Sequence, residues 1–168
     1  MFGRIKAWLA SRDGAPVAPD GYRRLAFPGG TVDLPANWLM NDGTGEGRLI
    51  ARSPDRQIEI VFSVIYFAAG TLEEDIERFA MLASRRVQEE GARSEDAVAT
   101  RPDVLVQDGD TLVAQYEGRD GGRRQFACKM AMRRGVLAIV HIEASGPDQP
   151  WLNDVSGVVF ESLALSGS

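Results

Sequence analysis

Apolar and polar residues alternate along much of the chain, and this pattern predicts β-strands. The longest such run is QIEIVFSVIYF, residues 57–67. One face of this expected strand is lined by Ile58, Ile60, Phe62, Val64 and Tyr66. The other is lined by Val61, Ile65 and Phe67. Because both faces are apolar, we expect other parts of the protein to cover the strand on both sides.

Two further strands are expected before this one. The strands should begin at Phe27, and the run TVDLPANW places Val32 and Leu34 on one face before Pro35 ends it. The segment RLIARS should then pair with residues 57–67 through a turn at 53–56, where Pro and Asp favour chain reversal. The glycine-rich stretch 41–47 between them lacks the G-K-[ST] ending of a phosphate-binding loop, so we interpret it as an ordinary loop.

A helix is predicted over residues 71–91. Thr71 and Glu74 have the T-x-x-E spacing of a capping box, and Gly91 is typical of a helix end. Apolar residues recur at three- and four-residue steps between them: Leu72, Ile76, Phe79, Ala83 and Val87. The stripe should pack on a sheet, and the acidic residues of the first turn should form a solvated face.

A four-strand meander should follow a polar connection at 92–101. The turns are expected at Asp108–Gly109, at 119–122 and at 133–135. A closing helix is predicted over 150–165, with its apolar side formed by Trp151, Leu152, Val155, Val158, Val159 and Ser162. Short turns require antiparallel neighbours. The fold class is therefore α+β, with an antiparallel sheet of about six to seven strands, a long helix after the third strand and a C-terminal helix packed on the sheet.

The N-terminal residues differ in character from the rest. We expect residues 1–26 to be a basic segment and linker, and residues 27–168 to be a single α+β domain. A short helix at 2–12 would carry Phe2, Ile5, Trp8 and Leu9 on one side. Such a segment could dock on a partner or touch a membrane surface, or it could lie on its own domain or fray.

Composition excludes several functional classes. The 168 residues carry a net charge of −5, which argues against nucleic-acid binding. The apolar and charged fractions, 44 % and 26 %, are those of an ordinary globular protein. One cysteine rules out an internal disulfide, and the charges within MFGRIKAWLASRDG do not suit a secretory signal. We therefore expect a cytoplasmic protein.

Cys128 and His141 are the one pair that could form a nucleophilic dyad. With a two-residue loop at Arg134–Gly135 the two lie opposite each other, whereas a three-residue loop at 133–135 puts His141 on the other face. We favour the three-residue loop because it gives an all-apolar face and makes Cys128 a core residue. One His and one Cys without ligand spacing also give no metal site. We expect no catalytic residues, no metal and no cofactor.

The order of elements, together with Leu34-Pro35-Ala36-Asn37-Trp38, resembles the Mog1/PsbP-like fold. Members commonly begin with a strand ending in a Pro-x-x-Trp turn, and the resemblance covers residues 27–165. Members of this fold generally act through protein partners and not as enzymes, and they include bacterial adaptor-chaperones. The resemblance implies an adaptor- or chaperone-like function, with no active-site residues to carry over.

Two functional hypotheses follow. The first is a non-catalytic protein-binding module that uses an apolar surface of the sheet or a helix groove. The second is a small-ligand-binding or enzymatic domain with a pocket between helix and sheet. If both helices cover the same side of the sheet, the opposite side exposes an apolar strip formed by Val61, Ile65, Phe67, Leu137 and Ile139. Its partner would be an apolar helix or segment, from another chain or from residues 2–9 of this one.

Overall fold

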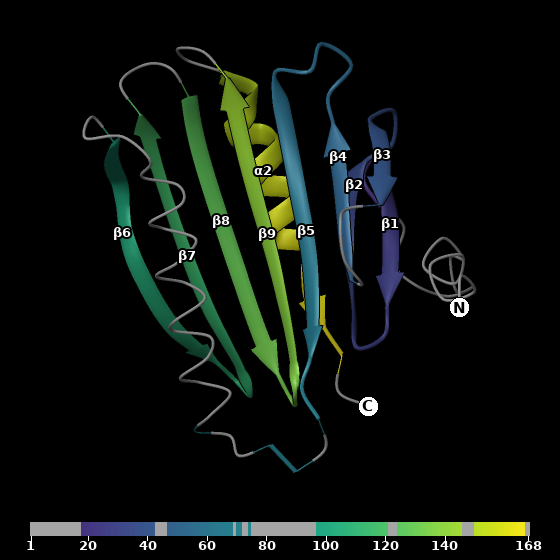
Figure 1. The fold of residues 1–168 in the computed structure, drawn as a ribbon, viewed down its shortest axis with the longest axis vertical. Helices are drawn as coiled ribbons and strands as arrows, with labels where there is room; N and C mark the ends of the chain where they lie inside the picture. Colours follow the sequence, from purple (N-terminus) through teal and green to yellow (C-terminus); the bar gives the residue numbers. More distant parts are fainter. Residues whose placement is uncertain are drawn as a thin grey trace.

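Two antiparallel sheets and a C-terminal helix make up the described part of the computed structural model, which comprises residues 18–42, 47–68, 70–71, 74, 97–120, 124–145 and 150–166. The large sheet has the strand order β3-β4-β5-β9-β8-β7-β6, and the small sheet has the order β1-β2-β10 (Figure 1). The strands are β1 (Tyr22–Phe27), β2 (Gly30–Pro35), β3 (Leu39–Asp42), β4 (Arg48–Arg52), β5 (Ile58–Tyr66), β6 (Ala97–Asp108), β7 (Thr111–Asp120), β8 (Arg124–Arg133), β9 (Val136–Ser145) and β10 (Ala164–Leu165). The helix is α2 (Pro150–Ser162).

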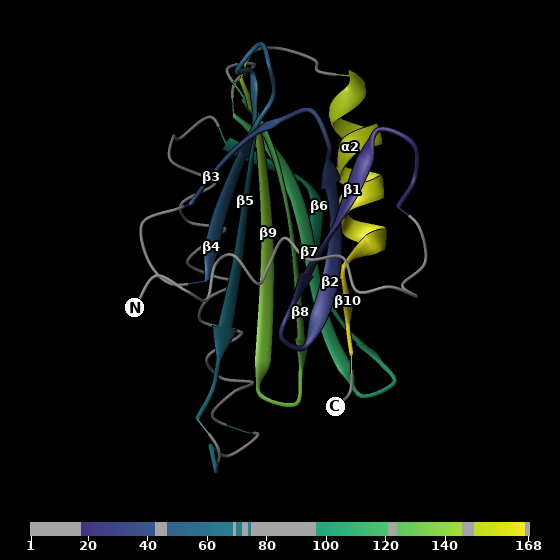
Figure 2. The same ribbon diagram turned by 90° about the vertical axis from the view of Figure 1, so that its right-hand side faces the viewer.

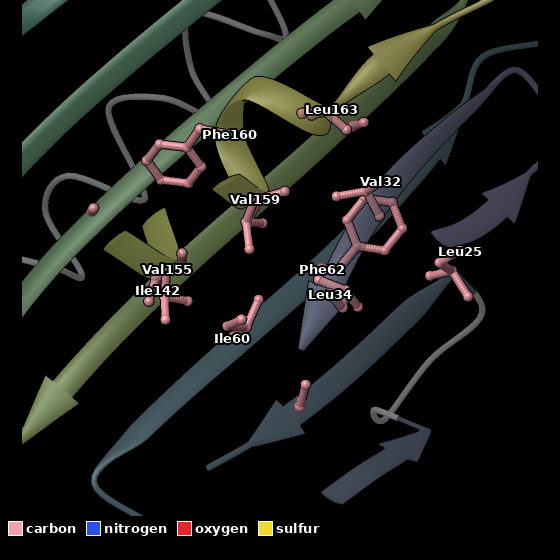
Figure 3. Packing of buried hydrophobic residues seen from close by; sticks show 14 of the residues in the cluster. Leu25, Val32, Leu34, Ile60, Phe62, Ile142, Val155, Val159, Phe160 and Leu163 are labelled. Atoms are coloured by element: carbon pink, nitrogen blue, oxygen red, sulfur yellow. The ribbon is translucent and has the colours of Figure 1, made fainter. Parts of the chain in front are cut away.

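Helix α2 and the small sheet lie on the same side of the large sheet (Figure 2). We call this side the α2 face and the other the opposite face. The core between these layers is filled by apolar side chains from all three, as Figure 3 shows. Its members include Leu25, Val32, Leu34, Ile60, Phe62, Ile142, Val155, Val159, Phe160 and Leu163. The predicted antiparallel sheet and the closing helix packed on it are confirmed.

The helix α2 buries a stripe that differs in part from the predicted one. Leu152, Val155 and Val159 are buried as expected. Phe160 is also buried, at 4 % exposure, whereas Val158 is only partly buried. The helix ends at Ser162, because the next residues turn into β10, which pairs with β2.

Three short or early strands were absent from the prediction. Strand β1 begins at Tyr22, so the expectation that the strands start at Phe27 is wrong. Strand β3 occupies part of the expected loop at 41–47, and β10 lies within the expected helix. Strand β6 begins at Ala97 and not after residue 101. The predicted helix at 71–91 falls almost entirely outside the described residues.

The β8–β9 hairpin has the register that we did not favour. Arg133 pairs with Val136, so the loop consists of Arg134 and Gly135 alone. Both loop residues have positive φ, 46° and 77°, as a type I′ turn requires. Cys128 is therefore paired with His141, and the expectation of a three-residue loop is wrong. An arginine accepts the left-handed conformation here because the two-residue turn matches the twist of the strands.

Candidate functional site

The strip residues predicted on the sheet come together on the opposite face. Ile65 pairs with Leu137, and Ser63 pairs with Ile139, so these strands present Val61, Ile65, Leu137 and Ile139 on one side. Phe67 lies just beyond the end of β5 and packs against a buried apolar cluster formed by β7, β8 and β9. Phe2, Ile5, Trp8 and Leu9 lie outside the described residues.

Burial divides the opposite face into two parts. Toward β7, β8 and β9 it is a closed apolar cluster in which Leu137 is fully buried, so this side chain does not contribute to an exposed strip. The buried members of the cluster are Ala114, Phe126, Cys128, Met130, Met132 and Leu137. Val61, Ile65, Phe67 and Ile139 are partly buried. Among the described residues, the more open part of the opposite face therefore lies toward β3, β4 and β5.

The structure adds two apolar residues to this open part. Ile50 of β4 pairs with Val61, and Leu39 of β3 pairs with Arg52, which places both on the opposite face. Leu39 is 56 % exposed, the highest value among the large apolar residues in the described part of the chain. We call the set Leu39, Ile50, Val61, Ile65 and Phe67 the β3–β5 strip. Sequence reasoning missed Leu39 because it assigned residues 39–40 to no element and residues 41–42 to a loop. The alternation in RLIAR already places Ile50 between two arginines.

Charged side chains flank the β3–β5 strip. Alternation along β4 puts Arg48, Ile50 and Arg52 on the same face. The Nε atom of Arg52 lies 2.6 Å from a carboxylate oxygen of Glu59, its cross-strand partner. Arg48 pairs with the uncharged Ser63. The surface is thus an apolar strip with arginines beside it.

A second charged group lies farther along the same face, near the end of β9. The Glu143 carboxylate accepts a hydrogen bond from Arg124 at 3.1 Å, and Nε2 of His141 lies 3.7 Å from the same oxygen. The neighbouring His141 lowers the pKa of Glu143 most strongly and Arg124 lowers it further, against the opposing effect of partial burial, so that it comes to about 2. Glu143 is therefore ionised at neutral pH.

Cys128 and His141 are neighbours, but the thiol is closed to solvent. Cys128 is 0 % exposed and belongs to the apolar cluster. Nδ1 of His141 is buried and has no hydrogen-bond partner among the described residues. A nucleophilic thiol has to meet its substrate and is usually found in a partly exposed, electropositive environment. The burial of Cys128 therefore favours a packing role for this side chain over a catalytic one. The sequence argument for the same role relied on a three-residue loop, which the structure does not have.

The described residues contain no group of three or more His, Cys, Asp or Glu side chains that could hold a metal ion. Within the same ranges, no helix has both the length and the apolar character needed to cross a bilayer. The expected absence of a metal remains a prediction.

No protein-family model matches the chain, and no curated protein sequence matches it. Solved structures do. Cyanobacterial PsbP (CyanoP) from Synechocystis sp. PCC 6803 aligns with a TM-score of 0.63 at 15 % identity, over 94 % of this chain and 99 % of that one. The Saccharomyces cerevisiae Ran-binding protein Mog1p aligns with a TM-score of 0.50 at 8 % identity, over 86 % and 95 %. Identities this low speak for architecture alone, and on that evidence the protein has a Mog1/PsbP-like fold.

Proposed function

We propose that this protein is a non-catalytic protein-binding module, adaptor- or chaperone-like, and that it binds its partner through the β3–β5 strip. The observation that carries the proposal is the strip itself. It combines a highly exposed leucine with partly buried aliphatic and aromatic side chains on one face. Apolar residues gathered on an accessible surface and rimmed by charge are characteristic of interaction sites.

The fold gives further support. Mog1p, which shares the architecture, is described as a Ran-binding protein, so the fold is compatible with binding another protein. The single cysteine and the net charge of −5 suit a cytoplasmic setting, which we include in the proposal. Within the fold, the bacterial adaptor proteins are the group that we favour.

The alternative, a ligand-binding or enzymatic domain with a pocket between helix and sheet, has less support. Leu152, Val155, Val159 and Phe160 fill the space between α2 and the large sheet with apolar side chains. A small-molecule site needs convergent polar groups in a cavity. On the opposite face, the burial of Cys128 removes the thiol from any substrate.

The proposal is tested by two matched substitutions at exposed apolar positions. Leu39→Asp places a charge on the β3–β5 strip, whereas Val106→Asp places one at the other edge of the sheet, on a side chain that is 49 % exposed. Tagged full-length protein is expressed in its source organism, and co-purifying proteins are quantified by mass spectrometry. We expect recovery of a specific partner to fall about tenfold or more with Leu39→Asp, because the new charge would be buried against an apolar partner, and to be unchanged with Val106→Asp.

Both variants should keep the melting temperature of the native protein, because both positions are exposed. Equal recovery of every co-purifying protein with the native chain and with the Leu39→Asp variant would contradict the proposed site.

A further inference from the structure

We infer that the segment bound by the β3–β5 strip is an apolar peptide segment that carries a carboxylate, and that this carboxylate pairs with Arg48. The inference rests on the proposed function and specifies the chemistry of the partner. It is drawn from the difference between two arginines on one strand.

Arg48 and Arg52 lie on the same face of β4, on either side of Ile50. The charge of Arg52 is balanced by Glu59 at 2.6 Å. Arg48 is exposed and lies across from Ser63, which has no charge to offer. Among the described residues, none forms a hydrogen bond or ion pair with the Arg48 side chain. Arg48, which lies beside the β3–β5 strip, is therefore available to a partner.

The backbone holds Arg48 in a fixed position. Gly47, the residue before it, has a φ of 81°, and its carbonyl accepts a hydrogen bond from the Val64 amide at 2.8 Å. A Cβ atom at Gly47 would lie 2.5 Å from the Val64 carbonyl oxygen, so only glycine fits this contact. Since the start of β4 is tied to β5, a bound segment would meet the arginine at a defined distance from Ile50 and Val61.

The positive guanidinium group of Arg48 favours a partner that carries a negative charge. Its planar set of donors matches a carboxylate in a two-pronged pair, and arginine is enriched in interfaces for this reason. A nucleic acid would need several clustered cations, and the adjacent Arg52 is already paired. A basic segment would be repelled. An apolar segment with one Glu or Asp beside it therefore fits both parts of the surface.

The test uses three synthetic peptides with the same apolar core and with glutamate, glutamine or lysine at the flanks. Binding to the full chain is measured by fluorescence anisotropy. We expect the glutamate peptide to bind about two- to fivefold more tightly than the glutamine peptide, as one exposed ion pair allows, and the lysine peptide to bind most weakly. The differences should shrink as ionic strength rises.

Variants then assign the preference to Arg48. Arg48→Gln should remove the difference between the glutamate and glutamine peptides, and Arg48→Glu should reverse the order of glutamate and lysine. Arg119→Glu makes the same change of charge at an exposed position on the α2 face and should leave the order intact.

The outcomes separate this inference from the proposed function. If the three peptides bind equally and Leu39→Asp weakens all of them, the strip is a binding site but the acidic preference is wrong. If the preference persists in Arg48→Gln, another residue reads the charge and the inference is wrong. If no peptide binds, the result contradicts both the inference and the proposed site.

Discussion

Glu143 shows how a single residue on the opposite face couples stability to pH. Its carboxylate lies between His141 and Arg124, and its pKa is lowered from 4.5 to about 2. A lowered pKa in the folded state means that the ionised form is stabilised by folding. The stabilisation is complete above the unfolded pKa, near 4.5, and is lost as the pH falls toward 2.

We predict that Glu143→Gln makes the free energy of unfolding less dependent on pH between about 4.5 and 2. The variant should be less stable than the native protein at neutral pH and should approach it at the acid end of this window. Urea unfolding at a series of pH values measures the effect. Asp20→Asn is the control, because Asp20 is exposed and makes no ion pair with the described residues. Parallel pH profiles for the native protein and Glu143→Gln would disprove the assignment.

The pairing of Cys128 with His141 could not be predicted reliably from the types of the residues in the two strands. The alternation of apolar residues along β8 and β9 is correct for both strands, but their register depends on one loop residue. The sequence favours the register that gives one wholly apolar face. In the observed register, Cys128, Met130 and Met132 share a face with His141 and Glu143, while Lys129 and Arg133 fall on the α2 face. Both cations there donate to backbone carbonyls near the C-terminus, Lys129 to Phe160 and Arg133 to Leu165.

At the scale of elements, the end of α2 is tied to the small sheet by a partly buried serine, Ser162. The Ser162 hydroxyl accepts a hydrogen bond from the Asp33 amide at 2.8 Å and donates one to the Val159 carbonyl at 2.9 Å. The Asp33 carboxylate is 1 % exposed and forms two bonds of 2.7 Å with Arg24, its cross-strand partner. A buried carboxylate is stable only when its partners are present.

We predict that Ser162→Ala lowers the free energy of unfolding by about 1–3 kcal/mol, because it leaves the buried Asp33 amide without an acceptor. Ser156→Ala is the matched control. Ser156 lies in the same helix and is buried, whereas Ser162 is partly buried; the Ser156 hydroxyl only donates to the Asn153 carbonyl, so the change should cost within about 1 kcal/mol. Chemical denaturation of both variants gives the comparison. An equal loss in both would show that the bond to Asp33 adds nothing to stability.

Elements with strong local signals could be predicted from the sequence, and those defined by pairing could not. Strand β5 and the hairpins of the meander carry alternation and glycine turns, which act over a few residues. Strand β10 has two residues and exists because Ala164 and Leu165 pair with β2, more than a hundred residues earlier. Strand β3 is likewise defined by its pairing with β4. The β3–β5 strip was therefore predicted only in its β5 part, since Leu39 and Ile50 join it through pairing.

At the scale of the whole molecule, the described chain enters the small sheet at Tyr22, directly after Gly21. The Tyr22 amide donates to the Pro19 carbonyl, and the Ala36 amide donates to the Gly21 carbonyl. From Tyr22 onward the chain is part of the small sheet, and Leu25 and Phe27 are buried in the core. Residues 22–26, which the sequence assigns to the N-terminal segment, are thus part of β1.

We predict that deletion of residues 1–20 lowers the free energy of unfolding by less than about 2 kcal/mol, the range for a peripheral segment. Deletion of residues 1–28 is the contrasting change. It removes β1 together with Leu25, Phe27 and Arg24, the partner of Asp33. The shortened protein should no longer fold into a structure with a cooperative thermal transition. Thermal unfolding by circular dichroism compares the two. A molten or insoluble product from the shorter deletion would mean that residues 1–20 contribute to the core.

The pairing of β5 with β9 has a consequence for synthesis of the chain. Phe62 and Val140 are paired at the middle of the large sheet, although the residues of β6, β7 and β8 are translated between them. During translation, β5 therefore leaves the ribosomal exit tunnel long before β9, the strand that pairs with its free edge. During this interval the nascent chain presents an apolar strand with open hydrogen-bonding groups, the kind of segment that aggregates or recruits a chaperone. The large sheet can close only once β9 has emerged, and the small sheet is completed only when β10 follows α2.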